Sequence, residues 1–222
     1  MPIRFAYHPG NVAHSSAPEV DETMRAACRS LDIELIDMPG ATSCGAGILG
    51  QANRRLQITL NARTMSIAED LGMDIITPCA TTAATLFEDL MMLKADSSLM
   101  GEVNRTLEKT TGRVLEGSIK IRHLLQVILE DIGIENFSKK VKNPIPSPLA
   151  PYYGPNLQQV GLIGGDDVFD PWYMESVIEA GGGDPIRYAS RTSSAGTPGI
   201  FSEEQTVLRQ SANILSLSLI HI

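Results

Sequence analysis

Apolar segments alternate with turn residues in the N-terminal part of the chain and predict a β-α-β arrangement. The apolar segment 3–7 precedes a proline-glycine turn, which is typical of a strand that ends in a loop. Apolar residues then recur at helical spacing over 20–31, and Ser16 with Glu19 is expected to form a capping box at the helix start. The apolar segment 33–36 is expected to be the second strand. Strands joined in this way are usually parallel, so the fold class is α/β.

The same alternation continues and places two cysteines at junctions. Apolar residues recur at nearly every fourth position over 56–71, which predicts a long helix, and 74–77 follows as a third strand. Cys44 and Cys79 then fall between a strand and the next helix. Because the carboxyl ends of parallel strands line one edge of a sheet, where ligands usually bind, the two cysteines are expected to lie near each other.

The middle of the chain suggests a domain boundary. Residues 97–141 are expected to be wholly helical, with His123 packed in an apolar stripe. The proline-rich segment 143–148 resists both helix and central strand and is typical of a linker. We therefore expect a first domain over 1–142 and a second over 149–222.

The second half repeats the order of the first. We expect a strand within 149–153, a helix near 172–180, a strand near Ile186 and a loop over 191–196. The repeat predicts two tandem Rossmann-like domains with parallel sheets, of which the second is incomplete. The final segment 214–222 alternates apolar and polar residues and is expected to be a strand.

Composition excludes several classes of partner. The formal net charge of −8 and the pI near 5.0 argue against nucleic acid as a partner. No apolar run approaches the roughly 20 residues that cross a bilayer, and the start lacks the layout of a secretory signal, so we expect a cytoplasmic protein without direct membrane insertion. Three cysteines are an odd count for a disulfide framework and favour metal or redox chemistry, although Cys28 falls on the apolar face of the first helix and is expected in the core.

Short motifs around the turns carry a family resemblance. They read Tyr7-His-Pro-Gly-Asn11, Thr42-Ser-Cys-Gly45 and Thr77-Pro-Cys-Ala-Thr-Thr82 in the first half, and Tyr152-Tyr-Gly-Pro155 and Thr192-Ser-Ser-Ala-Gly196 in the second. This layout resembles the pair of cysteine-rich CCG domains in the B-type subunit of heterodisulfide reductase and in the related subunit of non-classical succinate and fumarate reductases. The resemblance implies an electron-transfer or disulfide-reducing subunit of an oxidoreductase complex. It also implies partner subunits that carry iron-sulfur clusters or flavin, through which the protein would associate peripherally with a membrane.

The resemblance further implies a set of site residues. In the family the motif cysteines hold non-cubane [4Fe-4S] clusters, and Cys44 and Cys79 keep two of these metal-binding positions. Residues without a thiol stand at the other positions, which are Asn11, Ser43, Thr82, Pro155, Ser194 and Ala195. Because iron-sulfur iron is held by several thiolates, these replacements imply degenerate sites with either no cluster or one incompletely ligated cluster.

Several alternatives stay open at this point. The chain could be a cluster-less scaffold that docks to an iron-sulfur or flavin partner, or a binder of a small molecule in the vacated pocket. Cys44 and Cys79 could be structural remnants, a redox pair of thiols, or ligands of a zinc ion shared with Ser43 and with His8 or His14. No catalytic residue can be nominated, since no Ser-His-Asp set is recognisable.

Overall fold

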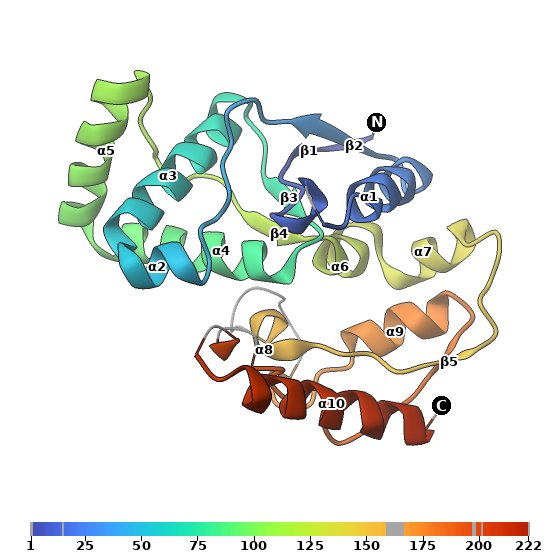
Figure 1. The fold of residues 1–222 in the computed structure, drawn as a ribbon. Helices are drawn as coiled ribbons and strands as arrows, with labels where there is room; N and C mark the ends of the chain where they lie inside the picture. The colour runs from blue at the N-terminus through green and yellow to red at the C-terminus, as the bar shows by residue number, and fades with distance from the viewer. Residues whose placement is uncertain (1, 15, 159–166, 197–198, 201, 222) are drawn as a thin grey trace. The chain divides into compact units, whose positions relative to one another are not determined.

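The structure is a computed structural model that describes residues 2–14, 16–158, 167–196, 199–200 and 202–221 (Figure 1). The chain divides into two compact units, Met1–Leu124 and Leu125–Ile222. This division precedes the proline-rich segment 143–148, and the domain boundary expected in that segment stays a prediction.

Four parallel strands form the sheet of the first unit within the described residues. They are β1 (Ile3–Tyr7), β2 (Ile33–Asp37), β3 (Ile75–Thr77) and β4 (Ile121–His123), in the order β2-β1-β3-β4. Ala6, Ile75 and Ile76 in the two central strands have no exposed surface. Central strands buried on both faces are typical of a parallel sheet covered by helices, which confirms the α/β fold class.

Helices connect consecutive strands of this sheet. They are α1 (Glu19–Ser30) after β1, α2 (Ile48–Ala52) and α3 (Arg54–Asp70) after β2, and α4 (Ala80–Ala95) and α5 (Ser97–Thr111) after β3. Polar side chains separate adjoining helices. The Asn53 side chain accepts a hydrogen bond from the Leu56 N–H at the start of α3, and the Asp96 carboxylate accepts from the N–H groups of Ser98 and Leu99 at the start of α5. These caps explain why one continuous apolar pattern folds as two helices.

The capping box expected at the first helix is wrong. Helix α1 begins at Glu19, Pro18 occupies the N-cap position, and no side chain caps the helix start. Acidic residues in the first turn, which include Asp21 and Glu22, interact favourably with the positive end of the helix dipole instead. The expected burial of Cys28 is confirmed, since its exposed fraction is 1%.

The expectation of continuous helix over 97–141 is also wrong. Helix α5 ends at Gly112, whose φ of +70° is the left-handed conformation common at helix ends. The chain then returns to the sheet as β4, whose three residues are all buried, and buried and exposed residues alternate over 115–120 directly before it. That spacing of two is the strand period. The apolar residues of this region also fit a helical spacing, which led to the prediction of a helix.

The second unit contains a smaller parallel pair of strands. Its described elements include β5 (Pro148–Leu149), β6 (Asp184–Pro185), α8 (Gly154–Leu157), α9 (Tyr173–Ala180) and α10 (Glu204–His221). It also holds a π-helical segment (Val127–Ile132), which follows the short helix α6 (Leu124–Gln126), and α7 (Ile134–Lys140). The strand, helix and strand expected near 149, 172–180 and 186 are present, whereas the tandem Rossmann-like repeat stays a prediction.

The strand expected at the C-terminal end is wrong. Residues 214–221 belong to α10, and residue 222 lies outside the described residues. Val207, Ile214 and Ser218 are buried, seven and four residues apart, which is a helical spacing. The short alternation of Leu and Ser near the end of the chain is typical of a strand, and it led to the wrong prediction.

The second unit contains a buried ion pair. Glu175 in α9 has no exposed surface, and its Oε1 lies 3.5 Å from Nε of Arg191, whose side chain is 4% exposed. The Tyr153 hydroxyl donates a hydrogen bond to Glu175, and the Arg191 guanidinium lies 5.6 Å from the centre of the Tyr153 ring. The pair therefore joins the residues after β5, helix α9 and the loop that precedes Thr192.

Candidate functional site

The loops after the first three strands converge at one edge of the sheet. The strand order β2-β1-β3-β4 means that the chain leaves β1 toward one side for β2 and returns to the other side for β3. Such a reversal opens a crevice outside the carboxyl ends of the two central strands, where ligands of α/β proteins bind. His8, Met38 and Pro78 are the first residues of the three loops that border it.

Cys44 lies at the centre of this convergence. It is completely buried in the loop after β2. The Thr82 hydroxyl, in the first turn of α4, donates to the Cys44 Sγ at 3.5 Å, and the Asn11 side-chain amide donates to the same sulfur at 3.7 Å. Residues at three of the positions implied by the resemblance therefore meet, two from loops and one from the first turn of α4.

Cys79 is placed in the same region by a close backbone approach. It is the N-cap residue of α4 and is partly exposed. Gly10 packs directly against it: a Cβ atom built on Gly10 would lie 2.7 Å from the Cys79 Cβ and 3.8 Å from the Thr82 hydroxyl oxygen. The expectation that the junctions carrying Cys44 and Cys79 lie close together thus agrees with the geometry, in which Thr82 lies near both.

We predict that Gly10→Ala destabilises the first unit by about 2 kcal/mol, because the new Cβ meets Cys79 and because Gly10 has a φ of +87°. The matched control is Gly72→Ala, whose φ is +66° and whose Cβ would meet nothing within 4 Å. Denaturant unfolding of both variants measures the difference. Equal losses of stability would show that backbone strain alone matters and that the contact with Cys79 does not.

His8 fixes the loops and is not placed as a metal ligand. It is 4% exposed, its Nδ1 accepts a hydrogen bond from the Gly10 N–H at 3.1 Å, and its Nε2 lies 2.9 Å from the Thr42 carbonyl oxygen, to which it donates. Both ring nitrogens are therefore engaged with the backbone. Ser43 is engaged locally, since its hydroxyl accepts from the Gly45 N–H at 3.1 Å. The side chain of His14 lies outside the described residues.

Sequence reasoning missed a buried polar network behind Cys44. The Asn61 side chain in α3 donates to the Cys44 carbonyl oxygen at 3.0 Å and to Asp89 Oδ2 at 2.6 Å, and both Asn61 and Asp89 have no exposed surface. Arg54 Nη2 lies 2.7 Å from Asp89 Oδ1. Burial raises the pKa of the Asp89 carboxyl, against the opposing effects of the Asn61 hydrogen bond and the Arg54 charge. The sequence offered one signal for this network, which was the polar residue Asn61 on an apolar face of the helix predicted over 56–71.

His123 is buried in β4, as a packed residue was expected to be, although in a strand. Its Nε2 lies 3.0 Å from the carbonyl oxygen of Pro78, which precedes Cys79. Burial lowers the pKa of His123 to about 4, against a smaller opposing effect of the Pro78 carbonyl. The imidazole is therefore neutral in the folded protein at neutral pH.

The low pKa of His123 predicts a pH-dependent stability. In the unfolded chain the histidine binds a proton near pH 6.5, whereas the folded protein resists protonation down to about pH 4. Its contribution is complete above pH 6.5 and is lost as the pH falls from 6.5 toward 4, by about 3 kcal/mol in total. We expect His123→Gln to flatten the stability curve of the first unit over this range in denaturant unfolding. A variant with the slope of the unmodified protein would contradict the assignment.

One turn of the second half contains the same hydrogen bond as the corresponding turn of the first half. Pro155 lies exposed in α8, whereas Ser194 and Ala195 lie in the loop before Gly196. The Ser194 hydroxyl accepts from the Gly196 N–H at 3.1 Å, the same bond that Ser43 forms with Gly45. The Tyr152 hydroxyl holds this loop by accepting from the Ala195 N–H at 3.0 Å and donating to the Ser193 carbonyl at 2.9 Å. None of these three positions supplies a sulfur.

A family comparison matches the part of the chain that carries the first-half site. Residues 5–86 match the family of the CCG cysteine-rich domain. The chain contains a CCG domain. All five first-half positions, Asn11, Ser43, Cys44, Cys79 and Thr82, lie inside this CCG domain. The match confirms the resemblance that the turn motifs carry.

Proteins similar to this chain include subunits of redox enzymes. It is 23% identical over 194 residues to the B-type subunit of the ferredoxin/F(420)H(2)-dependent CoB-CoM heterodisulfide reductase of Methanosarcina acetivorans, and the match covers 86% of this chain and 64% of the relative. It is 24% identical over 222 residues to the 8-methylmenaquinol:fumarate reductase membrane anchor subunit of Wolinella succinogenes, covering 97% of this chain and 75% of the relative. The chain is thus homologous to both kinds of subunit, and it spans about two thirds of the length of the Methanosarcina relative.

A solved structure supports the fold. A hypothetical protein from Helicobacter pylori superposes with a TM-score of 0.73 at 15% identity, covering 96% of this chain and 38% of the other. In the described part of the chain, no helix is long and apolar enough to cross a membrane. Nor do three or more His, Cys, Asp or Glu side chains gather as a metal-binding group among those residues.

Proposed function

We propose that this protein is a component of an oxidoreductase complex, similar to the B-type subunit of heterodisulfide reductase, whose first CCG site has lost its iron-sulfur cluster. The homology to subunits of such complexes supports the first part of this proposal. One observation carries the second part: Thr82 and Asn11, at cluster positions of the family, donate hydrogen bonds to the Cys44 sulfur.

The donor set at the site does not fit the family's cluster. Iron-sulfur clusters are held by several thiolates, because thiolate is both soft and anionic. Cys44 and Cys79 are the two thiols at the family's positions, and the donors that contact the Cys44 sulfur are an amide and a hydroxyl. His8 is engaged with backbone groups through both ring nitrogens. We therefore derive no electron-transfer step through a cluster at this site.

The role that remains is binding of partner subunits. We propose that the chain acts as a cluster-less interaction subunit that binds an iron-sulfur or flavin-bearing partner in the cytoplasm and reaches a membrane only through such partners. The alternative is an electron-transfer or disulfide-reducing subunit that keeps one cluster with unconventional ligands. The persistence of Cys44 and Cys79 in adjoining loops favours that alternative enough to test it.

Metal analysis after anaerobic purification separates the two functions. We expect a folded, colourless protein without iron or acid-labile sulfide, and without charge-transfer bands in the visible spectrum. Several irons per chain with such bands would overturn the cluster-less proposal. In that case Cys44→Ser and Cys79→Ser would each abolish the bands, whereas Cys28→Ser, at a buried core position, would leave them unchanged.

A further inference from the structure

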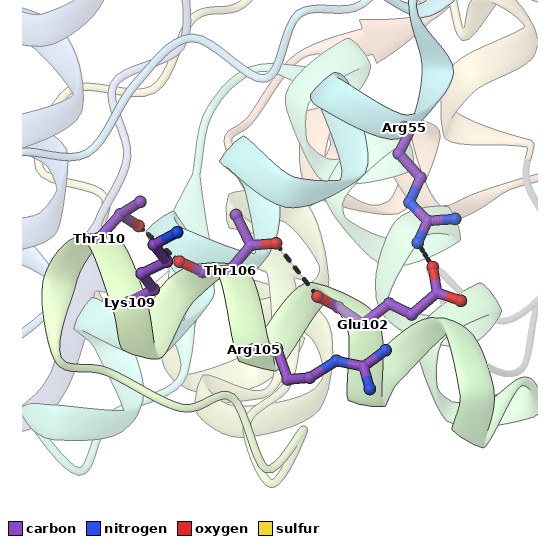
Figure 2. Close-up of a pocket in the computed structure, with 6 residues that line it drawn as sticks. All are labelled: Arg55, Glu102, Arg105, Thr106, Lys109 and Thr110. Carbon is purple, nitrogen blue, oxygen red and sulfur yellow. Dashed lines mark hydrogen bonds and ion pairs between the residues drawn. The ribbon is translucent and has the colours of Figure 1, made fainter.

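A basic pocket lies on the surface formed by α3 and α5, within the first unit (Figure 2). Its volume is about 610 Å³, and it is lined by Arg55, Glu102, Arg105, Thr106, Lys109 and Thr110. Arg55 comes from the first turn of α3, and the other five residues recur at helical spacing along one face of α5. The pocket belongs neither to the crevice at the strand ends nor to any role proposed above.

The charges of this pocket are unbalanced. Glu102 is its single acidic residue and forms an ion pair with Arg55. Within the described residues, Arg105 and Lys109 form no ion pair with any carboxylate, whereas Arg25 and Arg54 each pair with two. Two uncompensated cations thus share one pocket on a protein whose formal net charge is −8.

The two cations lie on one exposed face of α5. Arg105 and Lys109 are four residues apart on α5, where like charges repel each other. The hydroxyls of Thr106 and Thr110 donate to the carbonyl oxygens of Glu102 and Thr106, as Figure 2 shows. The hydrogen-bond donors left for a ligand are therefore guanidinium and ammonium groups, which favour anionic oxygens.

We propose that this pocket binds a small molecule that carries a diphosphate group. A diphosphate has enough charge to compensate Arg105 and Lys109 together and enough anionic oxygens to bridge one turn of α5. Guanidinium groups bind phosphate oxygens in a bidentate manner, and the positive end of the α3 dipole adds to the potential beside Arg55.

The experiment is a calorimetric titration of the full chain with inorganic pyrophosphate at low ionic strength. We expect saturable binding that weakens about tenfold in Arg105→Gln and about tenfold in Lys109→Gln, as loss of one charge-assisted hydrogen bond predicts. Glu102→Gln should instead tighten binding severalfold, because it releases Arg55 from its ion pair and removes the single acidic group of the pocket. Opposite signs at neighbouring positions of one helix are not expected from general loss of folding.

The matched control is Lys120→Gln, which removes one exposed positive charge outside the pocket. It should leave pyrophosphate affinity unchanged. Absence of saturable binding, or equal weakening by Lys120→Gln, would overturn the proposal, since the latter indicates nonspecific attraction. Citrate binding more tightly than pyrophosphate would also overturn it and would indicate a carboxylate site.

Discussion

Arg191→Met is expected to lower the free energy of unfolding of the second unit by about 3–5 kcal/mol, the usual effect of removing one partner from a buried ion pair. The variant keeps a flexible apolar side chain but removes the guanidinium beside Glu175, which has no exposed surface. The carboxylate would then retain the Tyr153 hydroxyl as a donor but no buried cation. An uncompensated buried charge is the cause of the loss.

Trp172 provides the measurement. It is the single tryptophan of the chain, it directly precedes α9, and the Arg187 guanidinium lies 5.5 Å from the centre of its ring. Its fluorescence during denaturant unfolding therefore reports on the second unit. The control is Arg187→Met, because Arg187 pairs with Asp170 as Arg191 does but its side chain is 55% exposed, and we expect a small effect on the unfolding midpoint.

A double variant separates charge from packing. Replacing both partners, as Arg191→Met with Glu175→Leu, should recover much of the stability, because a buried pair exchanged for apolar residues is often nearly neutral. A double variant as unstable as the sum of the two single variants would contradict this account and would assign the loss to packing against Tyr153.

Asn61→Leu is expected to destabilise the first unit by about 4 kcal/mol and to loosen the loop that carries Cys44. The substitution removes the donor shared by the Cys44 carbonyl and Asp89 Oδ2 and leaves two buried acceptors without it. The Asp89 carboxylate would depend on Arg54 alone among the partners described for it, at a position where burial already raises its pKa. Two buried acceptors that lose their donor make this loss larger than that of an ordinary hydrogen bond.

Thiol labelling mapped by mass spectrometry tests the effect on the loop. Cys44 is completely buried and should react slowly in the unmodified protein and faster in Asn61→Leu. Cys28 is an internal reference, because burial raises the pKa of its thiol to about 11. Asn53→Ala removes only the N-cap of α3, at about 1 kcal/mol, and should leave Cys44 protected. Equal labelling of Cys44 in both variants would show that global stability, rather than the Asn61 contact, protects the thiol.

Elements with a strong local pattern were predicted correctly. The strands at 3–7 and 33–36 and the helix over 56–71 combine a clear apolar period with adjoining turn residues, and each appears within a few residues of the expected bounds. Strand β4 was missed because its three residues are stabilised by pairing with β3, more than forty residues earlier, rather than by their own propensity. The C-terminal helix was missed because a short alternation of Leu and Ser outweighed a burial spacing that only packing reveals.

The sequence by itself determined the first three strands and the helices that join them, and with them the placement of Cys44 and Cys79 between a strand and the next helix, because apolar periods and turn residues are local properties. It also indicated the match of residues 5–86 to the CCG domain, through motifs that surround those turns. Only the tertiary structure decided which side chains meet the Cys44 sulfur, that Asn61 and Asp89 support its loop, and that two helices form a basic pocket. These contacts join residues far apart in the chain, and their energies arise from burial and charge that exist only when the helices pack on the sheet.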